Sequence, residues 1–296
     1  MSARNWGLLL VLALLWGSSF FFYKVLVAVL PPITVVLGRL GLAALALNLW
    51  LWAQGQSIPL DRRSCLRFLL LGFLNCSFPF VLIAWSETRI TSGMASILSA
   101  TTPIFMMAVA HWATEDEKLS PGKALGIALG LLGVIVLVGP TAFHGASAVW
   151  GQLAVIGSSC LYGLGGVYSR RFTDMTPLVA ATGQITGAAI LLIPASLLID
   201  HPWTLPLPDA QVWGSLFTIA LVNTALAYVL YFRMVANVGV TYISLVTLLI
   251  PVIALWLGAV FLGESITLQA LAGMAIIALG LAATDGRLFK RRQATD

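Results

Sequence analysis

Apolar residues along the chain gather into long runs that are separated by short polar breaks. A helix needs about 20 mostly apolar residues to cross the hydrocarbon core of a bilayer. The runs lack the every-second-residue alternation of barrel strands, so helices are predicted. Ten such runs can be marked: Trp6–Val29, Ile33–Trp52, Phe68–Trp85, Ser92–Trp112, Gly122–Val138, Trp150–Ser169, Leu178–Ile199, Val212–Phe232, Val240–Leu262 and Thr267–Thr284.

The composition supports an all-α integral membrane protein. Hydrophobic residues make up 59% of the 296 residues and charged residues only 9%, against about 25% charged in a typical soluble domain. The net charge of +5 does not indicate nucleic acid, because the basic residues lie at the ends of apolar runs rather than in one patch. The three cysteines lack metal-binding spacing, so neither a metal site nor a cofactor is expected.

The distribution of Lys and Arg predicts the orientation in the membrane. Placing the N-terminus inside leaves only Arg89 in the outer loops, and cytoplasmic loops are normally the basic ones. Both termini are therefore expected in the cytoplasm, the second as a basic tail over 285–296 that can contact anionic lipid. The thirteen residues then on the inner side are Arg4, Arg62, Arg63, Arg67, Lys118, Lys123, Arg170, Arg171, Arg233, Arg287, Lys290, Arg291 and Arg292.

The chain also contains an internal repeat, with a first unit at 1–140 and a second at 149–284. Each unit has five predicted spans, and because five is odd the second must be inverted in the membrane. Inverted repeats allow inward-open and outward-open states around a shared site, which favours a transporter. An offset of 148 aligns Asn75 with Asn223, Ser96 with Ser244, Ser99 with Thr247, and Pro103 with Pro251.

Several of these features resemble a known family. The segment Trp16-Gly17-Ser18-Ser19-Phe20, the prolines of the fourth and ninth runs, and the stretch around Glu264 are similar to EamA-type members of the drug/metabolite transporter superfamily. Within it, the chain looks most like bacterial inner-membrane exporters of aromatic amino acids and related metabolites. The resemblance implies ten helices, with four of each half around a central cavity and the fifth peripheral.

The predicted spans contain few ionisable groups. Every Asp and Glu falls in a loop or at the end of a run, whereas a proton-coupled pump usually keeps an ionisable relay within its spans. The pattern therefore favours uncoupled transport and argues against cationic drugs as substrates. Two cations do enter the runs, Lys24 and Arg39. They are candidate contacts for a substrate carboxylate, or else they reach outward or bind main-chain carbonyls near Pro31-Pro32.

The remaining candidates are polar and aromatic residues on the predicted helices. Ser96, Ser99 and Pro103 share one helical face, which indicates either a wet cavity or close helix packing. Asn75 and Asn223 either contact substrate or bond across helices, and the aromatic residues either line the cavity or fill the core. Pro103 and Pro251 are expected to bend their helices. The candidate cavity lining is Trp16, Phe20, Asn75, Phe78, Phe80, Ser96, Ser99, Tyr162, Asn223, Tyr228, Ser244 and Thr247.

Gly122, Gly126, Gly130 and Gly133 form a small-residue stripe that predicts close contact with a neighbour in the same molecule or with a second copy; a monomer and a homodimer both stay open.

The sequence thus predicts an exporter of small, moderately apolar metabolites such as aromatic or other neutral amino acids. A nucleotide-sugar or phosphate-ester antiporter is the alternative, although it would need more buried basic groups. A multi-span enzyme is a distant one, because the runs hold no set of catalytic groups.

Overall fold

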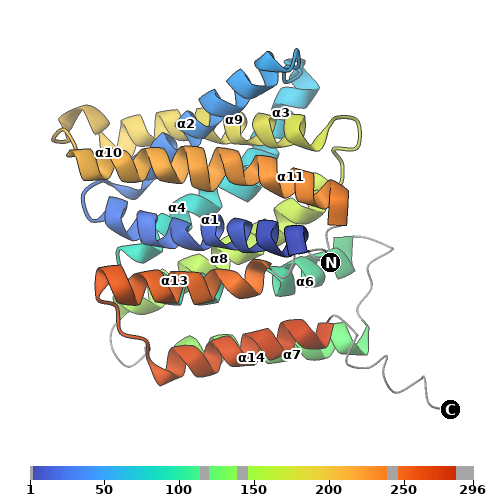
Figure 1. Cartoon of the computed structure of the whole chain (residues 1–296), viewed down its shortest axis with the longest axis vertical. Coiled ribbons are helices and arrows are strands. Elements are labelled where there is room, and N and C mark those ends of the chain that lie inside the picture. Colours follow the sequence, from blue (N-terminus) through green and yellow to red (C-terminus); the bar gives the residue numbers. More distant parts are fainter. Residues whose placement is uncertain (1–2, 114–119, 139–145, 239–245, 285–296) are drawn as a thin grey trace.

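The computed structural model describes residues 3–113, 120–138, 146–238 and 246–284. Within these ranges the regular structure is helical throughout (Figure 1). The principal helices are α1 (Ala3–Val27), α2 (Pro32–Ala53), α3 (Arg62–Gly72), α4 (Phe78–Glu87), α5 (Ser92–Ser99), α6 (Thr102–Ala113), α7 (Pro121–Val138), α8 (Ala146–Ser169), α9 (Pro177–Ala195), α10 (Ala210–Phe217), α11 (Ala227–Val238), α13 (Val246–Leu262) and α14 (Leu268–Thr284).

Short π-helical segments extend or join several of these helices. They are η1 (Phe73–Ser77) between α3 and α4, η3 (Ser196–Asp200) after α9, and η5 (Thr218–Leu226) between α10 and α11; a 3₁₀ turn, η4 (Pro202–Thr204), follows η3. With these joins, seven helices of the described chain are long and apolar enough to cross a membrane, and two further apolar helices are shorter. The membrane-protein class predicted from the composition is confirmed.

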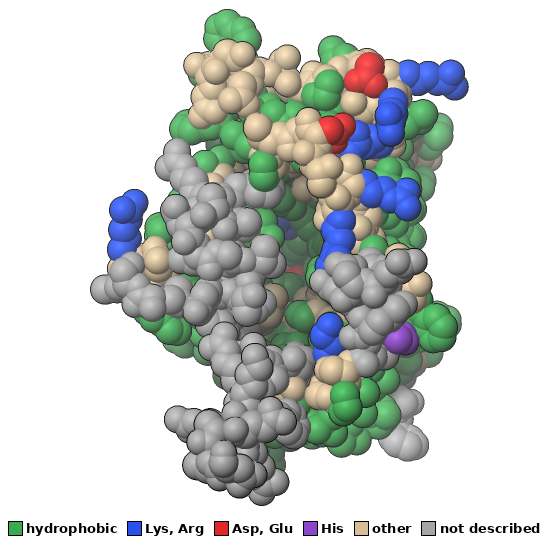
Figure 2. Space-filling view, turned by 90° about the vertical axis from the view of Figure 1, so that its right-hand side faces the viewer, with side chains coloured by type: hydrophobic (Ala, Val, Ile, Leu, Met, Phe, Trp, Pro, Cys, Tyr) green, Lys and Arg blue, Asp and Glu red, His purple; other side chains and the backbone are tan. Residues whose placement is uncertain are grey.

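The helices lie side by side along one common direction (Figure 1). The first residues of α1 and the last residues of α14 lie at the same end of this bundle, which we call the terminal end. Figure 2 looks onto the terminal end, which is hollowed near its centre and has Lys and Arg side chains along one side of the hollow. The other end of the bundle is called the distal end below.

Two spans, one in each half of the chain, share the same local structure. Each begins with an aspartate that caps its first helix: Asp61 accepts from the Ser64 main-chain N–H at 3.0 Å, and Asp209 from that of Val212 at 2.8 Å. An α-helix, a π-helical segment and a second α-helix follow in both. The π-helical segments contain Asn75 and Asn223, the pair aligned by the offset of 148. The two spans thus have the same order of cap, α-helix, π-helical segment and α-helix.

The fifth helix of each half packs chiefly on its counterpart, α7 on α14, along one side of the bundle (Figure 1). The glycine stripe makes this contact close, since a Cβ added at Gly133 would lie 2.6 Å from Ile277 Cγ1. The Gln269 amide also donates to the main-chain oxygens of Val136 and Leu137, at 3.1 and 2.6 Å. The stripe therefore meets a neighbour of the same chain, which is the first of the two predicted contacts.

The two predicted proline bends have different surroundings. In the fourth span, α5 ends at Ser99 and α6 begins at Thr102, so Pro103 lies in the first turn of α6, where its missing N–H costs nothing. In the ninth span, α13 continues through Pro251 from Val246 to Leu262. A break thus accompanies Pro103, whereas the described part of the ninth span is an unbroken α-helix.

Candidate functional site

Arg39 of α2 lies in the interior of the bundle with 5% of its surface exposed. Its guanidinium carbon is 4.2 Å from the ring centre of Phe80 on α4 and 5.0 Å from that of Tyr23 on α1. Its Nε donates to Thr224 Oγ1 in η5 at 2.8 Å. Arg39 is held in place by cation–π contacts and by this hydroxyl group, and its fork of donors lies among aromatic rings.

Aromatic rings extend from Arg39 toward the second half of the chain. Phe80 lies 6.5 Å from Tyr23 and 6.4 Å from Tyr162 of α8, both edge to face. The Tyr228 hydroxyl of α11 is 3.9 Å from the sulfur of Cys76. Phe20, 8% exposed, belongs to the same core. Phe20, Arg39, Phe80, Tyr162 and Tyr228, all candidates from the sequence, lie in this region of the core; we call these five residues, with Tyr23 and Thr224, the Arg39 cluster.

Lys24 does not join the Arg39 cluster. Its Nζ donates to the main-chain oxygens of Glu87 and Ile90, at 2.6 and 2.7 Å, and so caps the carboxyl end of α4. A cation is favoured there because the last carbonyls of a helix have no partner within it. The expectation that Lys24 binds main-chain carbonyls is met, at α4 rather than at the bend around Pro31-Pro32.

Both predicted asparagines bond across helices. Asn223 is 1% exposed, and its amide donates to Leu15 O at 2.6 Å and to Ser18 Oγ at 2.8 Å on α1. The Asn75 amide donates to Gln184 Oε1 on α9 at 3.4 Å. Such contacts stabilise helix pairs in a membrane, where an unpaired amide is costly.

The other predicted lining residues lie outside the Arg39 cluster. Ser96 is buried and donates to the Gly93 carbonyl of its own helix at 2.7 Å, whereas the buried Ser99 hydroxyl has no partner among the described residues. Trp16 packs on Tyr231 with ring centres 5.6 Å apart. Phe78 is 42% exposed and stacks on Phe73. Thr247 is partly buried, and Ser244 lies outside the described residues.

Glu87 is a buried carboxyl group that the sequence does not reveal. It is the last residue of α4 and, by sequence, one of the carboxylates at the ends of the apolar runs. Its side chain is nevertheless 0% exposed, and neither carboxylate oxygen has a hydrogen-bond partner among the described residues. Glu87 interacts with Lys24 of α1 and with Glu264 after α13. The residues of its own span cannot predict that these distant segments lie next to it.

Hydrogen bonds between distant parts of the chain fasten the distal end. The Glu264 carboxylate accepts from the Ser92 main-chain N–H and hydroxyl, both at 2.8 Å, at the start of α5. Asp200 accepts from the Thr34 N–H at 2.7 Å and from its hydroxyl at 2.8 Å. Each contact joins a residue of the first half of the chain to one of the second, so these bonds hold the two halves together at this end.

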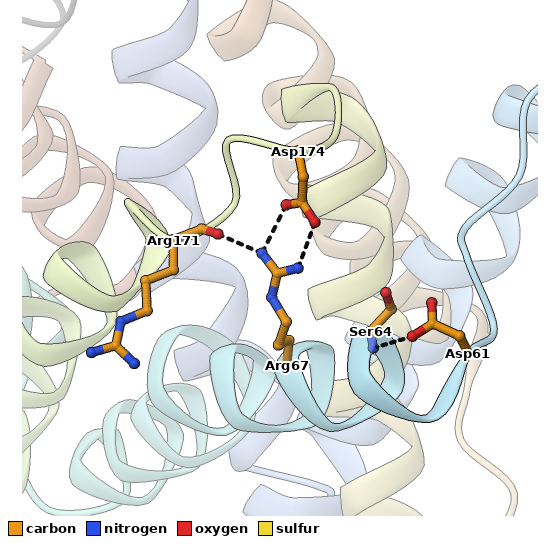
Figure 3. Close-up of polar contacts among 5 residues, drawn as sticks. All are labelled: Asp61, Ser64, Arg67, Arg171 and Asp174. Carbon is orange, nitrogen blue, oxygen red and sulfur yellow. Dashed lines mark hydrogen bonds and ion pairs between the residues drawn. The ribbon is translucent and has the colours of Figure 1, made fainter.

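The terminal end has a bidentate ion pair (Figure 3). Arg67 of α3 reaches Asp174, in the segment between α8 and α9, at 2.7 and 2.8 Å. It also donates to the Arg171 main-chain oxygen and lies over the Phe172 ring, 4.4 Å from its centre. Hydrogen bonding from Arg67 lowers the pKa of Asp174 to about 2. This pair is the counterpart, at the opposite end, of the contacts that fasten the distal end.

Comparison with known proteins places this arrangement in a family. The model of the EamA-like transporter family matches residues 5–139 and again residues 149–284. The chain belongs to the EamA-like transporter family. Each half of this EamA-like transporter therefore matches the same family model. Its family membership indicates membrane transport of a small molecule rather than catalysis.

Its relatives are similar over nearly their whole length. The uncharacterized transporter YoaV of Bacillus subtilis is 24% identical over 90% of this chain and 92% of its own. The uncharacterized inner membrane transporter YedA of Escherichia coli is 26% identical over 88% and 84%, and a protein of Salmonella typhimurium named a probable amino-acid metabolite efflux pump is 26% identical over 95% and 94%. A solved crystal structure matches all of both chains with a TM-score of 0.69 and 17% identity, which shows the same fold.

Proposed function

We propose that this EamA-like transporter is a multi-pass protein of a bacterial inner membrane that exports small zwitterionic metabolites, with aromatic or other neutral amino acids as substrates. The observation behind the proposal is the buried Arg39 guanidinium, which lies against the rings of Phe80 and Tyr23 and is bonded through Nε to Thr224. A guanidinium binds a carboxylate through two parallel hydrogen bonds, and the surrounding rings suit a flat or apolar side chain. The similar efflux pump of Salmonella typhimurium supports an amino-acid metabolite as cargo.

The proposed mechanism is alternating access by two inverted five-helix repeats around the Arg39 cluster, with both termini in the cytoplasm. Under this orientation, the hollow at the terminal end (Figure 2) faces the cytoplasm. The contacts of Glu264 with Ser92 and of Asp200 with Thr34 then close the outer side. Export requires these contacts to break and the terminal end to close around the same site.

A nucleotide sugar or another phosphate ester is a poorer cargo for this site. Such substrates have several negative charges and need several basic groups. Of the two predicted cations, Lys24 already binds the carboxyl end of α4, which leaves Arg39 as the buried cation of the described residues that faces the rings. Inhibition of transport by nucleotide sugars but not by amino acids would reverse this order.

The proposal is tested in liposomes that contain the purified protein and labelled Phe, Thr or Met. We expect protein-dependent exchange of at least one of these amino acids across the membrane, and no such exchange with any member of a wide amino-acid panel would contradict the proposal. Fusions of a reporter to each terminus test the orientation in the same membrane, and both reporters are expected on the cytoplasmic side.

Substitution of Arg39 tests the site itself. Arg39→Lys keeps the charge but loses the two-pronged donor set and the ring stacking, and Arg39→Gln removes the charge as well. Hydrogen bonds to charged groups contribute about 1.5–3 kcal/mol, so we expect the apparent substrate affinity to fall by about tenfold or more in both variants. Concentration-dependent exchange in liposomes provides the measurement. Arg89→Lys is the matched control, because it also loses a ring contact, with Trp85, but lies outside the Arg39 cluster.

A further inference from the structure

Glu87 presents a chemical problem that the proposed carboxylate site does not solve. Its side chain is wholly buried, yet neither oxygen accepts a hydrogen bond from any described residue. A carboxylate anion that has lost its water and has gained no donor is very costly, while the neutral acid is far cheaper to bury. It is also the one buried carboxyl group among the described residues. A group in this position is suited to bind a proton in one conformation and to release it in another.

The charged and titratable groups that act on Glu87 come from three of the segments packed around it. Lys24 and Tyr23 approach from α1, Arg39 from α2 and Glu264 from the segment after α13; Lys24, Glu264 and Arg39 interact with Glu87 electrostatically, and Tyr23 interacts with both Glu87 and Arg39. α5 and α8, which also pack on α4, have no charged residue. The Lys24 ammonium already occupies the free carbonyls at the end of α4, so a metal cation is disfavoured there and the proton is the cation that fits.

Glu87 interacts both with groups that line a cleft at the distal end and with groups of the Arg39 cluster. A cleft of about 420 Å³ at the distal end is lined by Lys24 and Glu264 together with residues of α10 and α13, so two of the groups that act on Glu87 are reached by water. On the inner side, Tyr23 contacts the Arg39 guanidinium with its ring, and its buried hydroxyl lacks a hydrogen-bond partner among the described residues. The carboxyl group is therefore placed to respond both to the solution and to a bound substrate.

We propose that Glu87 is the coupling site of the transporter: it holds a proton in this conformation and exchanges that proton for the ammonium group of a zwitterionic substrate whose carboxylate binds Arg39. The proposal rests on the proposed amino-acid export. The proton leaves the carboxyl group for water, and the resulting carboxylate pairs with the substrate ammonium. Because one carboxylate serves both cations in turn, proton and substrate move in opposite directions. The sequence favoured uncoupled transport because every carboxylate falls in a loop or at the end of a run. Glu87 is at such an end, but its side chain is buried, and the proposal of coupled exchange rests on that burial.

The first test needs no substrate. Infrared spectroscopy of the purified protein during a pH titration reports the carbonyl band of a protonated, buried carboxyl group. We expect one such band that is absent in Glu87→Gln and is shifted but present in Glu87→Asp. Asp61→Asn is the matched control, because it removes a carboxylate while asparagine caps a helix as well as aspartate does. A spectrum in which Glu87→Gln removes no band overturns the proposal.

The second test measures the exchange. Addition of Phe, or whichever amino acid shows transport, to the protein in weak buffer is expected to release protons to a pH indicator, whereas 3-phenylpropionate, which lacks the ammonium group, releases none. In liposomes, an imposed pH gradient is expected to drive accumulation in the native protein and in Asp61→Asn. It should drive none in Glu87→Gln, whose melting temperature serves as the check on folding.

The outcomes separate the two proposals. Amino-acid exchange that ignores the pH gradient and releases no proton contradicts the role of Glu87 and leaves the export proposal intact. Absence of transport for the whole panel contradicts the export proposal, while the infrared band still decides whether Glu87 binds a proton. Should Glu87→Gln fail to fold, Glu87→Asp and the native protein give the same decision through the shifted band and the proton release.

Discussion

At the scale of single residues, Asn223 shows how a polar side chain is used within a membrane-spanning bundle. Its amide bonds to a carbonyl and a hydroxyl of α1, and the next residue, Thr224, holds Arg39. Asn223 thus joins α1 to the segment that positions the guanidinium. This argues that the residue acts on the site through helix packing, without touching substrate.

Substitution of Asn223 tests this role. Asn223→Ala removes both donors and leaves the Leu15 carbonyl and the Ser18 hydroxyl without that partner. Since hydrogen bonds between membrane helices contribute about 0.6–2 kcal/mol, we expect a lower melting temperature in detergent together with weaker amino-acid exchange. Asn75→Ala, which loses only a long contact of 3.4 Å, is the comparison and should lose less. A melting temperature unchanged in Asn223→Ala would contradict the structural role.

Residues also mark the limit of what the sequence predicts. Arg39 was a candidate because a cation within an apolar run is rare and needs a partner. Phe80, Tyr162 and Tyr228 were candidates because rings can line a cavity as well as fill a core. Tyr23, Thr224 and Glu87 were not predicted. Their positions depend on which side of each helix meets the next one, and a single apolar run surrounded by other apolar runs has no clear polar face to reveal this.

At the scale of elements, the spans themselves were predictable, because the length and apolarity of a helix are local properties. The π-helical segments η1 and η5 were not, since they depend on how each chain segment accommodates its neighbours. Their occurrence at Asn75 and Asn223, after matching aspartate caps, extends the repeat from residue identity to backbone conformation.

The contact between α7 and α14 gives a prediction at this scale. Gly133→Leu places a large side chain where even a Cβ would lie 2.6 Å from Ile277 and 3.1 Å from the Gly273 oxygen. Overpacking of this kind typically costs about 1–3 kcal/mol, so the melting temperature should fall clearly. Gly41→Leu on α2 is the matched control, because nothing lies within 4 Å of a Cβ at that position. Equal losses in the two variants would contradict close packing of α7 on α14.

At the scale of the whole molecule, contacts at the two ends decide which state is populated. Arg67 and Asp174 join the two halves at the terminal end (Figure 3). A carboxyl group whose pKa is lower in the folded protein than its ordinary 3.8 stabilises the fold above that value. The stabilisation is lost as the pH falls from about 4 toward about 2, where the folded carboxylate takes up its proton.

Asp174→Asn tests this pH dependence. The native protein is expected to melt at a slightly higher temperature than the variant from about pH 5 to pH 7. This whole range lies above both the ordinary pKa of 3.8 and the pKa of about 2 that Asp174 has in the folded protein. Below about pH 4 the difference should shrink. The effect is small, since the pair is open to solvent. A difference that grows in acid would show that another group is responsible.

The pairing of α7 with α14 has a consequence for how the polypeptide is assembled. Each of these helices closes one half of the chain, yet its principal contact is with the helix that closes the other. In a half of the chain made by itself, the glycine-rich face of α7 or α14 would be exposed to lipid. If the chain is divided between Val138 and Ala146 and the two fragments are produced in one cell, we expect them to associate through α7 and α14 and to restore transport. Neither fragment is expected to transport by itself.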